Sequence, residues 1–257
     1  MNRHQVTVDT QKCIGCGMCT KVCVAHNITT VDKKAQILSD DCLLCGQCTA
    51  VCPTKAITVS GYDAGQIVEK ENMHLDPDEI LNAIRFRRST RNFKKQEIPK
   101  SVIDQILEAG RLTHTAKNTQ DVTYIVLDKE KERIEKMAVG LFQKIKPFAD
   151  LLSPLSKKNT IDSHFFFFQA PLVIVILAKN KTNGILAAQN MEFAAQANGL
   201  GVLFSGFFTA AFNTSTKIRR TMKAPKGKKA AITLVLGYPA INFLRSVPRK
   251  PLDAIYV

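Results

Sequence analysis

The sequence lacks any apolar stretch long enough to cross a membrane. Its longest apolar run, residues 170–178, has nine residues, fewer than half of the ~20 that a membrane-spanning helix needs. The apolar segment of a secretory signal peptide is also missing at the N-terminal end, because residues 2–5 are all polar. We therefore expect a cytoplasmic protein that does not associate with membranes.

Acidic residues are in the minority, with 22 Asp and Glu against 36 Lys and Arg, for a net charge of +14. Such an excess can attract nucleic acid, an anionic cofactor or an acidic protein partner. However, the basic residues are not interleaved with aromatic residues in the manner of an RNA-binding fold. We predict no nucleic-acid partner and interpret most scattered lysines as solvated surface.

Cysteine is absent from the last 205 residues, and all eight cysteines lie between positions 13 and 52. They form two runs of identical spacing, Cys-x2-Cys-x2-Cys-x3-Cys, and Pro53 follows the second. This spacing is typical of 4Fe–4S clusters, in which a tight loop supplies three thiolates and the fourth cysteine of each run binds the other cluster. The predicted ligands are Cys13, Cys16, Cys19 and Cys52 for one cluster, and Cys23, Cys42, Cys45 and Cys48 for the other.

Disulfides and zinc are the alternatives for these cysteines. Disulfides would need an oxidising compartment, and zinc sites usually show paired Cys-x2-Cys knuckles, not triplets with a trailing fourth cysteine. The segment instead resembles the bacterial-type two-cluster ferredoxins, although Val24 stands where a proline often follows the fourth cysteine. We predict a ferredoxin domain over residues 1–62, closed by short strands at 5–8 and 56–59.

Beyond a polar linker at residues 63–75, helical and strand patterns alternate in a larger domain over residues 76–257. A capping Asp76 and Pro77 mark the first helix, and periodic or β-branched stretches mark the elements after it. This alternation predicts an α+β fold with a central sheet flanked by helices, with α/β as the alternative. The expected helices are 76–87, 99–110, 184–198 and one capped near Asn213, and the expected strands are 122–127, 172–178, a short one after 199, and 231–237.

Four segments of the larger domain carry polar motifs that are weak individually. Residues 87–93 read RRSTRNF, and two arginines with a serine at a helix end can clamp a phosphate. The others are THTAKNTQ at 113–120, NGLGVLFSGFF at 198–208, and a tail with two arginines at 245 and 249. In this order they resemble the nitroreductase family of FMN-dependent oxidoreductases, and the ferredoxin fusion resembles a subgroup from anaerobes.

The resemblance implies FMN bound at the interface of a homodimer, with residues 114–121 contributed by the other subunit. It implies that Arg87 and Ser89 hold the phosphate and ribityl chain, that Arg91 approaches the pyrimidine edge, and that Gly206 lies against the ring. Both prolines of the family's loop at 114–121 are replaced, by His114 and Asp121. The implied FMN-binding residues are Arg87, Arg88, Ser89, Arg91, Thr115, Asn118, Leu203, Phe204, Ser205, Gly206 and Arg245, with Arg249 as the alternative to Arg245.

The fusion of two clusters to a flavin domain implies an electron route. We expect a low-potential donor such as ferredoxin or flavodoxin to supply the clusters, and FMN to reduce a nitroaromatic, a quinone or a similar small acceptor. A flavin-dependent dehydrogenase or enone reductase is one alternative, and an electron-transfer adaptor without its own substrate is another. No catalytic side chain is assigned, and residues 165–168, four phenylalanines, are expected to be core or active-site wall.

Overall fold

The computed structural model describes residues 5–62, 65, 67–71, 73–152 and 154–257. They form two compact units: one of residues 1–74 together with Thr115–Thr119, and one of residues 75–114 and 120–257. The first division falls inside the predicted linker 63–75, of which residues 63, 64, 66 and 72 lie outside the described residues. Residues 1–4 of the predicted ferredoxin domain also lie outside them.

The first unit is built from two short antiparallel strand pairs and two short helices. The strands predicted near its two ends pair with each other, Val6 opposite Val59. A hairpin between them turns at Asp32 and Lys33, both with positive φ. Its elements are β1 (Val6–Val8), α1 (Met18–Val22), β2 (Ile28–Val31), β3 (Lys34–Ile37), α2 (Gln47–Val51) and β4 (Ile57–Val59).

The repeated cysteine spacing becomes a repeated structure. Helices α1 and α2 each have five residues, and each follows a left-handed glycine, Gly17 at φ 70° and Gly46 at φ 72°. Glycine adopts this conformation without the penalty that other residues incur. Each short helix therefore starts directly after the glycine that follows the second cysteine of its run, and it carries the third cysteine on its first turn.

The second unit contains a four-stranded antiparallel sheet in the order β5-β6-β8-β7. Its strands are β5 (Thr123–Leu127), β6 (Leu172–Ala178), β7 (Gly201–Phe204) and β8 (Lys229–Gly237). Its helices are α3 (Pro77–Phe86), α4 (Lys100–Arg111), α5 (Lys131–Leu152), α6 (Pro154–Lys158), α7 (Lys181–Ala197), α8 (Gly206–Thr214) and α9 (Thr216–Thr221). No helix among the described residues is long and apolar enough to cross a membrane.

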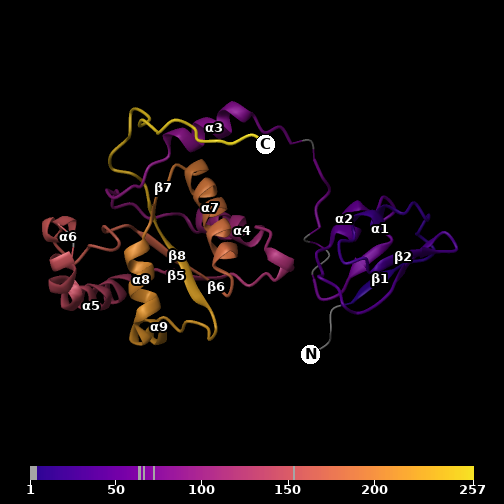
Figure 1. Cartoon of the computed structure of the whole chain (residues 1–257), viewed down its shortest axis with the longest axis horizontal. Coiled ribbons are helices and arrows are strands. Elements are labelled where there is room, and N and C mark those ends of the chain that lie inside the picture. Colours follow the sequence, from indigo (N-terminus) through magenta and orange to yellow (C-terminus); the bar gives the residue numbers. More distant parts are fainter. Residues whose placement is uncertain (1–4, 63–64, 66, 72, 153) are drawn as a thin grey trace. The chain divides into compact units, whose positions relative to one another are not determined.

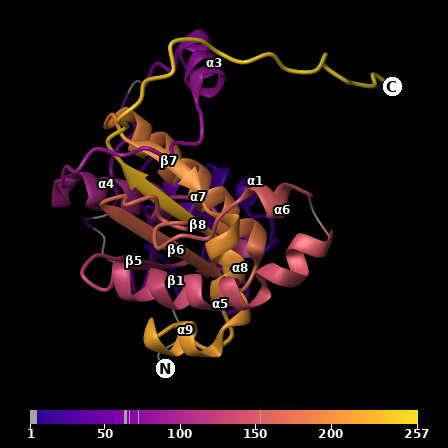
Figure 2. The same ribbon diagram turned by 90° about the vertical axis from the view of Figure 1, so that its left-hand side faces the viewer.

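Strand β6 lies at the centre of the core, and every one of its residues is buried. Because side chains alternate across a strand, Val173 and Val175 face a cluster that includes α5 and α8, whereas Ile174 and Ile176 face a cluster that includes α4 and α7. Figures 1 and 2 show helices on both faces of the sheet. This confirms the predicted α+β fold with a central sheet flanked by helices.

Capping side chains determine where several of these helices begin. Asp76 accepts hydrogen bonds from the backbone N–H groups of residues 78 and 79 at 2.8 and 2.9 Å, as its position predicts. Helix α7 begins three residues before the predicted start at 184, because the Asn180 side chain caps it by accepting from the Thr182 N–H. The prediction of a helix capped near Asn213 was wrong, since Ser205 and Ser215 cap α8 and α9 and Asn213 instead bonds to Ala230.

Residues 129–162 gave no element from the sequence, yet they contain the 22-residue helix α5. Its buried Glu135 accepts hydrogen bonds from the backbone N–H groups of Phe166 and Phe167 through one oxygen, Oε1, at 3.1 and 2.7 Å. Both phenylalanine side chains are fully buried in the core. These two rings are therefore core residues, one of the two predicted roles for the Phe165–Phe168 stretch.

Candidate cofactor sites

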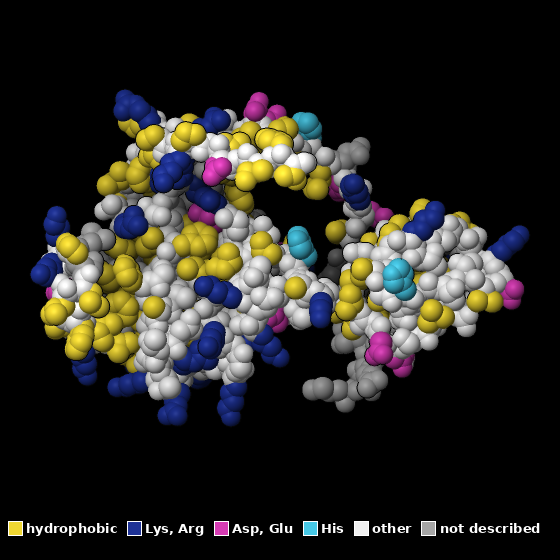
Figure 3. Space-filling view, viewed as in Figure 1, with side chains coloured by type: hydrophobic (Ala, Val, Ile, Leu, Met, Phe, Trp, Pro, Cys, Tyr) yellow, Lys and Arg dark blue, Asp and Glu magenta, His cyan; other side chains and the backbone are white. Residues whose placement is uncertain are grey.

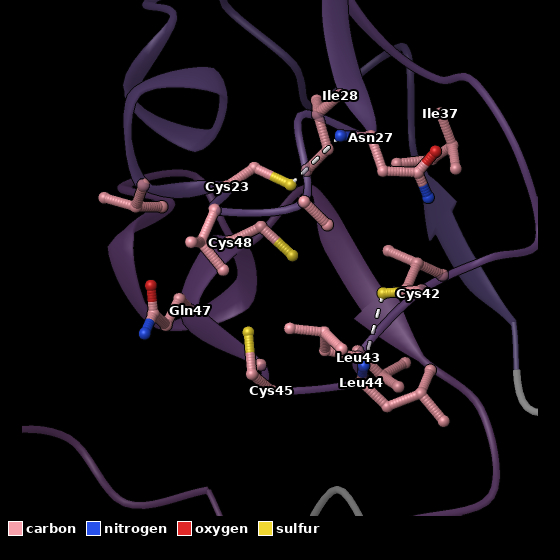
Figure 4. Close-up of a pocket in the computed structure, with 16 residues that line it drawn as sticks. Cys23, Asn27, Ile28, Ile37, Cys42, Leu43, Leu44, Cys45, Gln47 and Cys48 are labelled. Carbon is pink, nitrogen blue, oxygen red and sulfur yellow. Dashed lines mark hydrogen bonds between the residues drawn. The ribbon is translucent and has the colours of Figure 1, made fainter. Parts of the chain in front are cut away.

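Four cysteines from both runs surround one hollow in the first unit. Cys23, Cys42, Cys45 and Cys48 line it together with apolar side chains that include Ile28 and Ile37. Figure 4 shows the four sulfur atoms directed toward the same space. The other four, Cys13, Cys16, Cys19 and Cys52, line a second hollow with Ala35 and Ile57. The fourth cysteine of each run thus lies with the first three of the other run, the arrangement that a two-cluster site requires.

Backbone N–H groups donate to two sulfur atoms in each hollow. Ala35 and Ala56 donate to Cys13 and Cys52 at 3.3 and 3.2 Å in one hollow. Asn27 and Leu44 donate to Cys23 and Cys42 at 3.3 Å in the other. Such donors stabilise negative charge on sulfur and tune a bound cluster. The chemistry of the donor set therefore fits thiolates that hold an iron–sulfur core.

Burial opposes ionisation of the thiols, whereas these hydrogen bonds favour it. Burial raises the pKa of Cys19 and of Cys48, both of which are buried. Burial also opposes ionisation of Cys52, but hydrogen bonds from Ala56 and Thr54 outweigh it and lower the pKa of that thiol. Among the described residues, no three His, Cys, Asp or Glu side chains form a group that could hold a single metal ion.

The RRSTRNF segment of the second unit presents unsatisfied cationic donors. Arg88 donates from Nη1 to the backbone carbonyls of Arg85 and Arg87, but its Nε and Nη2 atoms are buried without a hydrogen-bond partner. Leaving buried charged donors unpaired is unfavourable. Two oxygens of a phosphate would satisfy both atoms at once in the forked geometry that guanidinium groups favour. This observation fits the phosphate of FMN.

Arg87 has an anionic neighbour that the sequence analysis missed. Its Nη1 lies 2.7 Å from Oε2 of Glu192 on α7, as an ion pair without the alignment of a hydrogen bond, and its guanidinium stacks over Phe193 at 5.6 Å. Burial raises the pKa of Glu192, whereas Arg87 lowers it. A charged residue in the otherwise small and apolar pattern of α7 was the signal that could have marked it.

Two motifs far apart in the sequence lie side by side. Ser89 forms a parallel bridge with Val202 of β7, and Thr90 donates its N–H to the Val202 carbonyl at 3.0 Å. Gly201 is required here because a Cβ atom would lie 2.3 Å from the Thr90 hydroxyl oxygen. The phosphate-clamp motif and the strand leading to Gly206 are therefore parts of one surface.

Gly206 lies at the start of α8, directly after this strand. A Cβ atom built on it would meet nothing within 4 Å, and the residue is exposed. The next residue, Phe207, is 64% exposed and packs against Phe165, with ring centroids 5.7 Å apart. Open space beside a glycine and an exposed aromatic ring suit a planar ring system, and the sequence analysis had not assigned Phe207 to a site.

Other predicted FMN residues have different surroundings. Leu203 belongs to the buried core, and the Ser205 side chain caps α8. Phe204 is half-buried and Arg91 is exposed. Arg245 and Arg249 lie in an exposed C-terminal segment without helix or strand. Thr115 and Asn118 belong to the first unit, where the Asn118 side chain amide donates to the carbonyls of Leu43 and Leu44 at 3.3 and 2.8 Å.

Comparisons with known proteins find two family domains along the chain. Residues 84–238 match the nitroreductase family, and residues 12–56 match the 4Fe-4S dicluster domain. FMN reductase (NADPH) of Bacillus subtilis is 28% identical over 68% of this chain and 72% of its own length. Iodotyrosine deiodinase of Hydra vulgaris is 26% identical over 76% of this chain and 78% of its own.

A solved structure shares the fold of the second unit. It is a nitroreductase with bound FMN from Desulfitobacterium hafniense, with a TM-score of 0.58 and 20% identity, over 69% of this chain and 98% of its own. At that identity the similarity concerns the fold.

Proposed function

The chain belongs to the nitroreductase family of flavin-dependent oxidoreductases, and from this premise we propose that it takes electrons through two 4Fe–4S clusters to an FMN that reduces a small acceptor. When bound, the clusters would supply one-electron transfer and the flavin two-electron chemistry. The observation that carries the proposal is the presence, in one chain, of two four-cysteine hollows and a family domain with unsatisfied buried guanidinium donors.

We assign different residues of the second unit to different parts of FMN. Arg88 offers two buried donors to the phosphate, and Arg87, held by its ion pair with Glu192, adds a second guanidinium group. Ser89 is exposed next to β7 and could donate its hydroxyl to the phosphate or ribityl chain. Gly206 leaves room for the ring. We assign Arg245 as a further phosphate ligand supplied by the tail, with Arg249 as its rival.

A group of aromatic side chains next to Gly206 is evidence for a flat acceptor. Phe207 is exposed beside Gly206, and Phe142 and Phe165 pack against it with centroids 6.2 and 5.7 Å away. Offset aromatic stacking favours nitroaromatics and quinones. The rings of Phe166 and Phe167 are buried in the core, whereas Phe165 of the same stretch packs against Phe207. The adaptor alternative, in which this stretch fills the pocket, remains a second candidate.

The surface of the second unit supports a homodimer. Helix α3 has no buried residue, and Ile80, Leu81, Ile84 and Phe86 are each at least 40% exposed. Figure 3 shows hydrophobic side chains gathered over this helix. Contiguous exposed apolar surface marks an interaction site. A second copy of the chain is the partner that the family resemblance indicates, with FMN at the interface.

The positive charge of the protein favours an acidic protein as its electron donor. Residues 216–229 contain seven Lys and Arg and no Asp or Glu, and Figure 3 shows basic side chains around α9. Positive surface of this kind accelerates encounter with a negatively charged protein, such as a low-potential ferredoxin or flavodoxin. If this surface steers the donor, raising the salt concentration should slow electron entry.

An anaerobic absorbance titration of the reconstituted protein, with iron and FMN quantified, tests the proposal. NADH or NADPH is added first, then a reduced low-potential ferredoxin, while the flavin and cluster bands are followed. Bleaching of FMN by ferredoxin alone would support entry through the clusters. Rapid bleaching by NAD(P)H would contradict that route. Enone turnover without nitro turnover would favour the enone-reductase alternative.

A further inference from the structure

The two cysteine loops of the first unit are supported in different ways. In the first loop, a Cβ atom on Gly15 would lie 2.1 Å from the Lys33 carbonyl oxygen, and Lys34 donates from Nζ to the Cys13 carbonyl. The β2–β3 hairpin therefore closes this loop from within the ferredoxin fold. The second loop, between Cys42 and Cys45, is held by Asn118.

Asn118 is suited to this contact by its backbone and by its side chain. It has a φ of 50°, a left-handed conformation that asparagine tolerates better than most residues. Its amide nitrogen carries two donors and bonds to two successive carbonyls, those of Leu43 and Leu44. One side chain thus fixes both peptide groups at the tip of the loop.

The fixed loop acts directly on a cysteine sulfur. Leu44 has a φ of 52°, and its N–H donates to Sγ of Cys42 at 3.3 Å. Hydrogen bonds to sulfur are one of the means by which a protein sets a cluster's potential. The orientation of the Leu44 peptide is therefore a link between Asn118 and the site formed by Cys23, Cys42, Cys45 and Cys48.

The segment that carries Asn118 is continuous with the flavin-family domain. Residues 115–119 connect α4, which ends at Arg111, to β5, which begins at Thr123. The equivalent support in the first loop comes from Lys33 and Lys34, inside the ferredoxin fold. The contact of Asn118 therefore distinguishes two cysteine sites that are otherwise related by an internal repeat.

We propose that Asn118 is a positioning residue for the cluster that Cys23, Cys42, Cys45 and Cys48 would hold, and that its hydrogen bonds to the second loop set the potential of this cluster apart from that of the other. The inference rests on the proposed function, which takes both clusters as one-electron carriers.

Two substitutions separate the hydrogen bond from the backbone conformation. Asn118→Gly removes the amide but keeps a residue that readily adopts positive φ, and Asn118→Asp keeps the shape but removes the donors. Lys117→Gln is the matched control, because Lys117 is the exposed neighbour and also has positive φ. All three variants are compared with the parent as fully reconstituted proteins.

Hydrogen exchange provides the first readout. In both Asn118 variants the amides of residues 42–46 should exchange about fivefold faster, the factor equivalent to a net hydrogen bond of roughly 1 kcal/mol. Residues 13–17, which have the same cysteine spacing, are the internal reference and should not change. Equal acceleration in both loops, or none in residues 42–46, would overturn the positioning role.

Spectroscopic redox titration provides the second readout. The potential of one cluster should shift in the Asn118 variants while that of the other stays constant. Equal shifts of both potentials, or no shift in either, would overturn the positioning role. A protein that binds no FMN would refute the proposed function, whereas the exchange experiment would still decide the role of Asn118.

Discussion

Oδ1 of Asp121 accepts a hydrogen bond from the side chain of Asn183 at 2.7 Å, which joins the start of β5 to the first turn of α7. Its Oδ2 accepts from the backbone N–H groups of Lys179 and Asn180, both at 2.8 Å. Asp121 stands where the nitroreductase family has a proline. The structure supplies the reason, since a carboxylate here satisfies donors at a helix start, where negative charge is favourable.

Replacement of Asp121 should destabilise the second unit. Asp121→Ala removes the acceptor that donors on residues 179, 180 and 183 share, which predicts a loss of about 2–4 kcal/mol in the free energy of unfolding. Urea denaturation measures this loss in the free energy of unfolding. Asp104→Ala is the control, because Asp104 forms an exposed ion pair with Lys100 and should cost little. Equal effects of the two variants would contradict the role of Asp121.

Replacement of Arg88 should weaken FMN binding without weakening the fold. Arg88→Ala removes two buried donors that lack protein partners together with the Nη1 bonds to two backbone carbonyls, so the apoprotein should have a stability close to that of the parent. The dissociation constant for FMN, measured by quenching of flavin fluorescence, should rise about 10- to 100-fold, as expected for a charged hydrogen bond.

The control for that experiment is Arg111→Ala, since Arg111 pairs with the exposed Glu108 at the end of α4. A large loss of apoprotein stability in Arg88→Ala, with unchanged FMN affinity, would show that Arg88 is structural.

Glu135 should make stability fall with increasing pH. Burial raises the pKa of its carboxyl above the ordinary value of 4.5, so the folded state holds this proton more tightly than the unfolded state does. Its contribution to stability is fully present below pH 4.5 and is lost as the pH rises through the folded pKa. The hydrogen bonds from Phe166 and Phe167, with His164 and Lys131 nearby, partly offset the effect of burial.

The Glu135→Gln variant tests this pH dependence of stability. The amide keeps an Oε1 that can accept from Phe166 and Phe167 but cannot ionise. From pH 4.5 upward the variant should become progressively more stable relative to the parent, by about 1.4 kcal/mol for each pH unit that separates the folded pKa from the unfolded pKa. Glu132→Gln, an exposed change on the same helix, should show no such trend, and a parallel pH profile for parent and Glu135→Gln would refute the assignment.

An acidic residue on α3 should disrupt the homodimer. Ile84 is 43% exposed on a helix with no buried residue, and Ile84→Asp would place a charge within the proposed interface. Light scattering after size-exclusion chromatography should show a shift from dimer to monomer, together with loss of bound FMN. Asn82→Asp adds the same charge on the same helix as the control. A monomeric parent protein would refute the homodimer.

Local patterns in the sequence predicted much of the fold and part of the site. The alternation of elements led to the correct fold class, and Asp76 to the start of α3. Within residues 129–162 no strong period distinguished α5 from a loop, because its burial depends on contacts such as that of Glu135 with Phe167, 32 positions away. The starts of α7 and α8 differ from the predictions because the Asn180 and Ser205 side chains cap these helices.

The sequence by itself predicted the cysteine sets, since three cysteines separated by two residues each lie close enough to surround one small space, and in this pattern the fourth cysteine of each run belongs to the other cluster. It also predicted, through RRSTRNF, a phosphate clamp. Only the tertiary structure decided that Glu192 pairs with Arg87, that Phe165 packs against Phe207, and that Asn118 holds the Leu44 loop. The first and last of these pair residues 105 and 74 positions apart, and such pairs arise from the packing of whole elements, which no local spacing encodes.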